Sequence, residues 1–138
     1  MRITLESDYA LRIITALAEK NTVVDAKNLS ELTSVTQRFT LKILHKLVIA
    51  DLVTSFKGVK GGYKLKEKAE NISLRRVIEL IDGPIMIARC LHSDEECALN
   101  QDKTSCTYHH IFDSISLEVA KKLSDITIAD VISKRYNI

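Results

Sequence analysis

Apolar positions in the first twenty residues recur at helical spacing. They follow the i, i+3, i+4 rule that places side chains on one face of a helix, and they are Tyr9, Ala10, Ile13, Ile14 and Leu17. A serine, Ser7, precedes this stripe, and serine often caps the start of a helix. The pattern therefore predicts a helix over residues 7–20 with one buried face.

Two further amphipathic segments follow after a break at residues 21–24. Asp25 can cap a helix over residues 26–33, and Thr36 can cap another that ends at about residue 50. The positions predicted to face inward are Ala26, Leu29 and Leu32 in the first segment and Phe39, Ile43, Leu44 and Leu47 in the second. Two short helices joined by a tight turn are typical of a helix-turn-helix.

The next segment has the pattern of a β-hairpin. Residues 52–56 and 63–65 are strand-like, and the sequence K-G-V-K-G-G lies between them at positions 57–62. Glycine permits positive φ angles, so the chain can reverse direction there. A helix-turn-helix followed directly by a hairpin with a basic tip predicts a winged helix.

The second half of the chain predicts two more helices. Ser73 can cap a helix that ends at Gly83, and its predicted inward positions are Leu74, Val77, Leu80 and Ile81. A long helix over residues 111–123 carries a narrow apolar stripe made of Phe112, Ile115, Val119 and Leu123. We expect this stripe to pair with the same helix of a second copy, although packing on its own domain is the alternative. Thr127 can cap a last helical turn that ends at residue 133.

The predicted fold is mainly α with a small β-hairpin. It comprises a winged helix-turn-helix domain over residues 1–83, a cysteine-containing sensor loop over 84–110, and a dimerisation helix with a C-terminal turn over 111–138. A chain of 138 residues is long enough to bury its own core. No apolar run approaches the ~20 residues that span a bilayer, and the first residues lack the apolar region of a signal peptide. We therefore expect a cytoplasmic protein that binds no membrane.

Charge distribution indicates a nucleic-acid partner more clearly than the net charge of +2 does. Basic residues concentrate at positions 38–68, whereas positions 94–102 are acidic. Arg38 and Lys42 on the outer face of the third predicted helix can reach phosphates or guanine edges, and Leu41 can touch a thymine methyl group. The full predicted DNA-binding set is Thr36, Gln37, Arg38, Leu41, Lys42, Lys57 and Lys60. A solvated basic helix face is the alternative.

All three cysteines and three of the four histidines lie between residues 90 and 110. They are Cys90, Cys97 and Cys106 with His92, His109 and His110. In a reducing cytoplasm, thiols favour metal or redox chemistry over a disulfide framework. Thiolate and imidazole suit zinc, copper(I) and iron–sulfur iron, so this segment predicts a soft metal centre.

Four stretches of the sequence resemble one family of regulators. They are M-R-I-T-L-E-S-D-Y-A-L-R, V-T-Q-R-F-T-L-K-I-L-H-K-L, S-F-K-G-V-K-G-G-Y-K-L and I-S-L-R-R-V-I-E-L-I-D-G-P. Over nearly its whole length the chain resembles the winged-helix iron–sulfur and redox transcription regulators, the family that includes IscR, NsrR, RirA and CymR. The resemblance implies a homodimer, a near-palindromic double-stranded DNA operator and no enzymatic activity.

The same resemblance implies an iron–sulfur cluster, of 2Fe–2S or 4Fe–4S type, on Cys90, Cys97 and Cys106. One family pattern completes the site with a histidine three residues after the third cysteine, which matches His109. Another uses an acidic residue near the start of the first helix of the other subunit, which matches Asp8. We favour His109 because imidazole is a softer ligand than carboxylate and lies one helical turn from Cys106. The cysteine gaps are longer than is usual in the family, and some members lack a cluster, so the purified protein can lack one.

Three alternatives to a cluster-controlled regulator follow from the same residues. A zinc-stabilised interaction module would use the cysteines with His92 or His109, but structural zinc sites usually space their ligands by about two to four residues. A cluster-free regulator would answer to a small molecule or a partner protein. A thiol enzyme would use a Cys–His pair, but no accompanying carboxylate or oxyanion-hole motif stands out. The sequence therefore favours operator binding controlled by a cluster or by thiol redox state.

Overall fold

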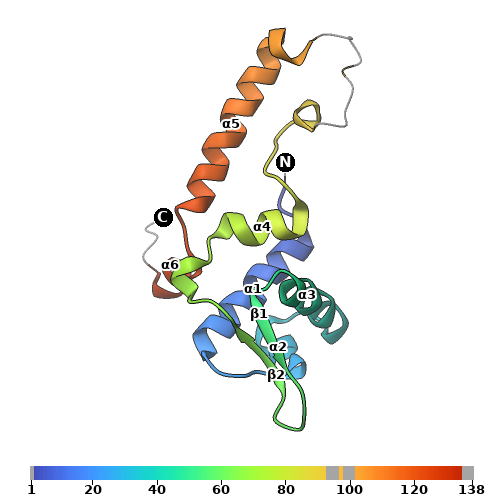
Figure 1. The fold of residues 1–138 in the computed structure, drawn as a ribbon, viewed down its shortest axis with the longest axis vertical. Coiled ribbons are helices and arrows are strands. Elements are labelled where there is room, and N and C mark those ends of the chain that lie inside the picture. The colour runs from blue at the N-terminus through green and yellow to red at the C-terminus, as the bar shows by residue number, and fades with distance from the viewer. Residues whose placement is uncertain (1, 93–96, 98–101, 135–138) are drawn as a thin grey trace.

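The computed structural model describes residues 2–92, 97 and 102–134. Within these residues the chain forms six α-helices and one two-stranded antiparallel hairpin (Figure 1). Their bounds are α1 Leu5–Lys20, α2 Ala26–Thr33, α3 Gln37–Ile49, β1 Val53–Phe56, β2 Gly62–Leu65, α4 Leu74–Asp82, α5 Thr107–Ser124 and α6 Ile128–Ser133. The prediction of a mainly helical winged-helix fold with a small hairpin is confirmed.

Side-chain caps fix where most of these helices begin. Asp25, Thr36 and Ser73 accept backbone N–H groups at the starts of α2, α3 and α4, as predicted. The predicted start of α1 is wrong, because Thr4 rather than Ser7 is the cap and accepts the Ser7 N–H at 3.2 Å. The predicted start of α5 is also wrong, since this helix begins at residue 107, four residues earlier than expected.

The main core is built around α1. Its predicted apolar stripe lies against α2, α3 and the hairpin, and most of the stripe is fully buried. The buried side chains at the centre are Ala10, Ile13, Ile14, Leu17, Leu29, Ile43, Leu44, Leu47, Leu52 and Ile72. Burial of this many aliphatic side chains is the main favourable term that holds the module together.

Three positions predicted to face inward are wrong. Leu32 is 52% exposed, Phe39 44% and Leu80 36%. The neighbouring residues Thr33, Thr40 and Ile78 are buried instead. The two threonines satisfy their hydroxyls internally: Thr33 donates to the Leu29 carbonyl at 2.7 Å, and Thr40 donates to the Val35 carbonyl at 3.5 Å. A hydrogen-bonded threonine is acceptable in a core, so on α2 and α3 the buried position lies one residue later than predicted.

The hairpin, which is the wing, is attached to the loop between α1 and α2. Its two strands pair from Val53–Leu65 to Phe56–Gly62. Tyr63 also exchanges two backbone hydrogen bonds with Val24, at 2.9 and 2.8 Å. A Cβ atom on Gly62 would lie 2.6 Å from the Val24 carbonyl group, so this close approach requires glycine. The sequence predicted only a break at residues 21–24, and this pairing was missed.

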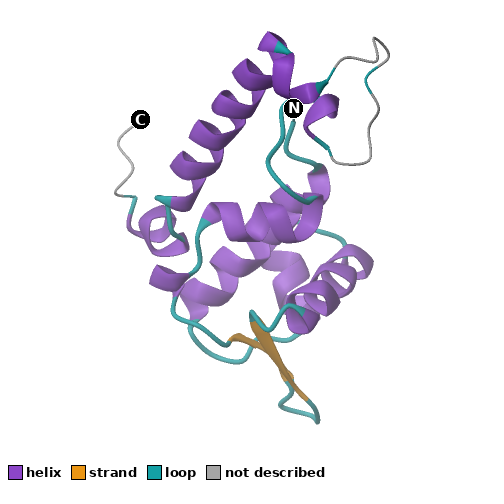
Figure 2. Cartoon of the chain, turned by 45° about the horizontal axis from the view of Figure 1, so that its top comes forward, coloured by secondary structure: helices purple, strands orange, loops and turns teal. Residues whose placement is uncertain are grey.

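The C-terminal helices extend from the module and then return to it. The long helix α5 leaves the body of the molecule, whereas the wing projects at the opposite end (Figures 1 and 2). Near its C-terminal end, α5 packs on α4 through a second small cluster made of Ile78, Ile85, Ala120, Val119 and Leu123. Helix α6 then places Ile128 in the main core. Among the described helices, none has both the length and the apolar character needed to cross a membrane.

Candidate functional site

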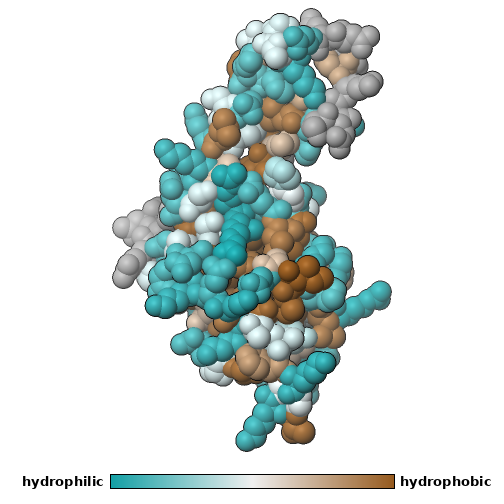
Figure 3. All heavy atoms as spheres, in the orientation of Figure 1, coloured by the Kyte–Doolittle hydropathy of each residue, from teal (hydrophilic) through white to brown (hydrophobic). Residues whose placement is uncertain are grey.

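The first candidate surface consists of α3 and the wing. Gln37, Arg38, Leu41 and Lys42 are exposed on α3, and its cap Thr36 is exposed at the N-terminal end. The wing tip places Lys57 and Lys60 in solvent, and the space-filling view shows both hydrophilic and hydrophobic side chains at this end of the molecule (Figure 3). All seven residues of the predicted DNA-binding set are therefore accessible, and the helix dipole at the N-terminal end of α3 favours an anion.

One residue of α1 contacts this surface and was missed by the sequence analysis. The Glu6 carboxylate lies 3.1 Å from the Lys42 ammonium and 2.6 Å from the Lys46 ammonium. The Lys46 ammonium, followed by that of Lys42, holds the pKa of Glu6 below its ordinary value. No local sequence signal indicates this contact, because Glu6 and Lys42 are 36 positions apart in the sequence.

Aromatic rings continue the contact between α1 and α3. The Phe39 ring meets the Tyr9 ring edge-on, with centroids 6.1 Å apart. The Lys42 ammonium lies 6.0 Å from the Phe39 centroid, and the Arg12 guanidinium lies 5.6 Å from the Tyr9 centroid. These contacts explain why Phe39 lies at the surface: its ring covers the seam between the two helices instead of entering the core.

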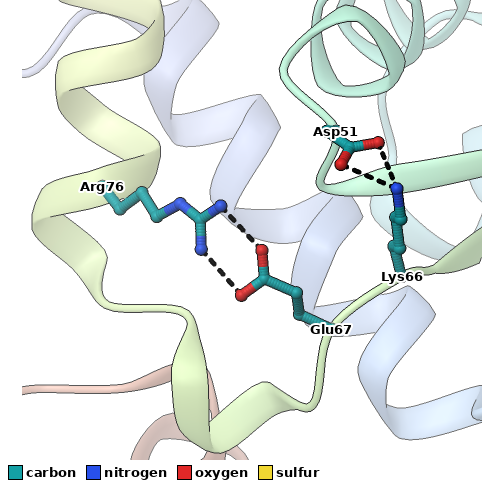
Figure 4. Close-up of polar contacts among 4 residues, drawn as sticks. All are labelled: Asp51, Lys66, Glu67 and Arg76. Carbon is teal, nitrogen blue, oxygen red and sulfur yellow. Dashed lines mark hydrogen bonds and ion pairs between the residues drawn. The ribbon is translucent and has the colours of Figure 1, made fainter.

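Two ion pairs fasten the base of the wing (Figure 4). Lys66, just after β2, binds both oxygens of Asp51 at 2.6 and 2.7 Å, and Asp51 lies in the turn between α3 and β1. Glu67 binds the Arg76 guanidinium of α4 through two parallel hydrogen bonds of 2.7 and 2.8 Å. The Arg76 guanidinium lowers the pKa of Glu67, and the Glu67 carboxylate raises the pKa of Arg76. The wing is thus tied both to the end of α3 and to α4.

The predicted metal ligands lie on separate elements of the chain. Cys90 belongs to a 3-10 turn at Arg89–Leu91, Cys106 is the residue before α5, and both are half-buried, as is Cys97. Most of the stretch between them, residues 93–96 and 98–101, is outside the described part of the chain. Within the described part, no three His, Cys, Asp or Glu side chains come together as a group that could hold a metal ion.

The two candidates for the fourth ligand differ in their surroundings. The Nδ1 atom of His109 is enclosed and has no hydrogen-bond partner among the described residues. Its neighbour His110 differs, because its Nε2 lies 2.7 Å from the Thr104 carbonyl oxygen. Asp8 is already engaged, with its carboxylate 2.6 Å from the Arg12 guanidinium in the same helix. Thiolates and an uncommitted imidazole nitrogen are the donor set that a soft metal centre prefers.

The predicted dimer stripe on α5 divides into two parts. Val119 and Leu123 pack against the α4 cluster of the same chain. Ile115 is 41% exposed, and Phe112 stacks on the exposed Tyr108 with ring centroids 6.3 Å apart. Further exposed apolar residues on this helix are Ile111 and Leu117. Hydrophobic side chains are visible on the surface of α5 in Figure 3.

Comparison with known families agrees with this fold and with the sequence motifs. The model of the Rrf2 family, described as an iron-dependent transcriptional regulator, matches residues 3–134. The chain belongs to the Rrf2 family. The predicted resemblance to the winged-helix iron–sulfur and redox regulators is thereby confirmed.

Individual relatives of this Rrf2-family chain are named as regulators. It is 25% identical to the HTH-type transcriptional regulator NsrR of Oceanobacillus iheyensis, over 100% of this chain and 94% of that protein. It is 28% identical to the regulator IscR of Vibrio atlanticus, over 95% of this chain and 75% of that protein. The solved structure of CymR, the global cysteine regulator of B. subtilis, matches with a TM-score of 0.72 and 25% identity, covering 97% and 98% of the two chains. These names agree with the prediction of a transcriptional regulator and not an enzyme.

Proposed function

We propose that this Rrf2-family protein is a dimeric regulator that binds a DNA operator through α3 and the wing. The observation that carries the proposal is the exposed basic set on these two elements, together with ion pairs that fix the wing relative to α3. Arg38 reaches the major groove from α3, and Lys57 and Lys60 follow phosphates from the wing. Phosphate contacts of this kind make binding strongly dependent on salt concentration.

The dimer is proposed to form through the exposed part of α5, with Phe112 and Ile115 at its centre. Val119 and Leu123 would then connect this interface to α4 in each subunit. A two-fold dimer places two recognition helices about one DNA turn, roughly 34 Å, apart, which requires a near-palindromic operator. Sedimentation at micromolar concentration should give a dimer for the parent protein. A monomer under these conditions would contradict the proposed interface.

The proposed control element is an iron–sulfur cluster on Cys90, Cys97 and Cys106. Such a cluster, when bound, supplies iron whose ligation and redox state respond to the cell's chemistry. The chain's own residues provide three thiolates and, from the first turn of α5, the His109 imidazole. The uncommitted Nδ1 atom of His109 supports it as the fourth ligand. Asp8 of the partner subunit is the competing proposal, and it would have to give up Arg12.

Replacing ligands one at a time tests this centre. After anaerobic purification, the parent should show visible absorbance with bound iron and sulfide. His109→Ala should lose much of this absorbance, while His110→Ala, the matched control next to it, should keep it. Bleaching by Asp8→Ala would instead favour ligation across the dimer. If Cys→Ser changes at all three cysteines leave both the spectrum and DNA affinity unchanged, the cluster proposal fails.

A further inference from the structure

Glu6 links the first turn of α1 to the lysines of the recognition helix. Its carboxylate faces both Lys42 and Lys46, with the distances of 3.1 and 2.6 Å given above. The Glu6 side chain is only 23% exposed, whereas the Lys42 side chain is 53% exposed. The carboxylate is therefore held against the protein, while the Lys42 ammonium that it binds remains accessible from solvent.

The first turn of α1 is itself held in place by α4. The Thr4 backbone N–H donates to the Asp82 carboxylate at 3.1 Å, and the Thr4 hydroxyl donates to its other oxygen. Thr4 also accepts the Ser7 N–H as the helix cap. Glu6 thus projects from a turn whose backbone is fixed on both sides, and the position of its carboxylate does not depend on the lysines alone.

We propose that Glu6 is a positioning residue that holds Lys42 and Lys46 in an internal ion pair and so lowers the affinity of α3 for DNA phosphate. The inference rests on the proposed function, DNA binding through α3. A phosphate that binds Lys42 must compete with a carboxylate already in place. One carboxylate shared by two ammonium groups leaves the trio with a single net positive charge.

The opposite role, in which Glu6 strengthens DNA binding, would require Glu6 to orient the two lysines toward the DNA. A carboxylate offers a phosphate no hydrogen-bond donor and adds a like charge next to the point of contact. The ion pair also reduces the number of free cations that a bound phosphate can neutralise, and counterion release drives much of protein–DNA affinity. Both effects act against DNA binding, so Glu6 lowers the affinity of α3 for DNA.

Glu6→Gln tests the proposal, because it removes the charge and keeps the shape. With a mixed-sequence DNA duplex at low salt, fluorescence anisotropy should show affinity rising about two- to ten-fold, the range that exposed ion pairs allow. The salt dependence should become steeper by about one for each lysine that gains a phosphate. Glu31→Gln on α2 controls for net charge. Glu6→Asp keeps the charge but withdraws it from the lysines, and should give part of the same gain.

A double-mutant cycle separates release of the lysines from general charge repulsion. In a Lys42→Gln/Lys46→Gln background, adding Glu6→Gln should change affinity by less than about two-fold. An equal gain in both backgrounds, or a loss of affinity on Glu6→Gln alone, would overturn the proposal. If neither parent nor variants bind DNA, the proposed function fails instead. Thermal unfolding of each variant verifies that it folds like the parent.

Discussion

The winged-helix module and the predicted sensor loop differ in how much of their geometry one copy of the chain provides. In the module, buried side chains of α1, α2, α3 and the wing meet in one core, and ion pairs fix the exposed elements to it. In the sensor loop, Cys90 and Cys106 lie half-buried on separate elements, and His109 keeps an unpartnered nitrogen among the described residues. The first region is a packed core, whereas the second carries soft donor atoms that do not come together as a group of three among the described residues.

This contrast predicts that a substitution in the core lowers the free energy of unfolding much more than a substitution on the exposed face of α5. Ile13→Ala should lower the free energy of unfolding by about 2–5 kcal/mol, because Ile13 is fully buried at the centre of the module. Ile115→Ala should cost far less in the isolated fold, since its side chain is already partly in solvent. Urea unfolding measures the loss of stability, and sedimentation shows whether Ile115→Ala weakens the proposed dimer. Similar losses of stability from both changes would remove the contrast.

The next effect concerns the proposed DNA-binding surface on α3 and the wing. If Arg38 reads a guanine, Arg38→Ala should cost about 1–3 kcal/mol of operator affinity and relax specificity at one position. Lys57→Ala should weaken binding to all sequences and reduce the salt slope by about one. We expect Lys42→Ala to have a smaller effect than either, because Glu6 already neutralises part of its charge.

Lys121→Ala on α5 serves as the control for these DNA-binding substitutions. It removes an exposed positive charge far from the wing, so operator affinity measured by anisotropy should hardly change. A loss of affinity as large as that of Arg38→Ala would show that total charge, and not the surface of α3, determines binding.

The smallest predicted effect lies at the base of the wing. The Arg76 guanidinium lowers the pKa of Glu67 below its ordinary value, so the folded state binds its proton less readily than the unfolded chain. The stabilisation is therefore present above the unfolded-state pKa and is lost as the pH falls through the folded-state pKa. Since the pair is largely exposed, it should contribute at most about 1 kcal/mol.

Urea unfolding between neutral and acidic pH tests this contribution. Glu67→Gln should be less stable than the parent at neutral pH, and the difference should shrink as the pH falls through the folded-state pKa of Glu67. Asp51→Asn breaks the neighbouring pair with Lys66 and is the matched control. A difference that stays constant with pH would show that the charge of Glu67 does not stabilise the wing.

The sequence by itself determined the local elements of this protein. Threonine, serine and aspartate caps predicted where four of the helices begin, at Asp25, Thr36, Ser73 and Thr127, and apolar periodicity predicted the buried face of α1. The glycines at 58, 61 and 62 predicted the wing, and clustered thiols predicted where a metal could bind. These signals are local, because caps, helical spacing and turns depend on residues within a few positions of one another.

Only the tertiary structure decided which residues meet across the chain. It pairs Tyr63 with Val24, returns Ile128 to the core, turns Phe39 outward against Tyr9, and holds Lys42 with Glu6. Each contact joins segments far apart in sequence, so the spacing of apolar residues within one helix or strand does not predict it. The outward position of Phe39 depends on the Tyr9 ring of α1, and that ring lies beside Phe39 only once the chain has folded.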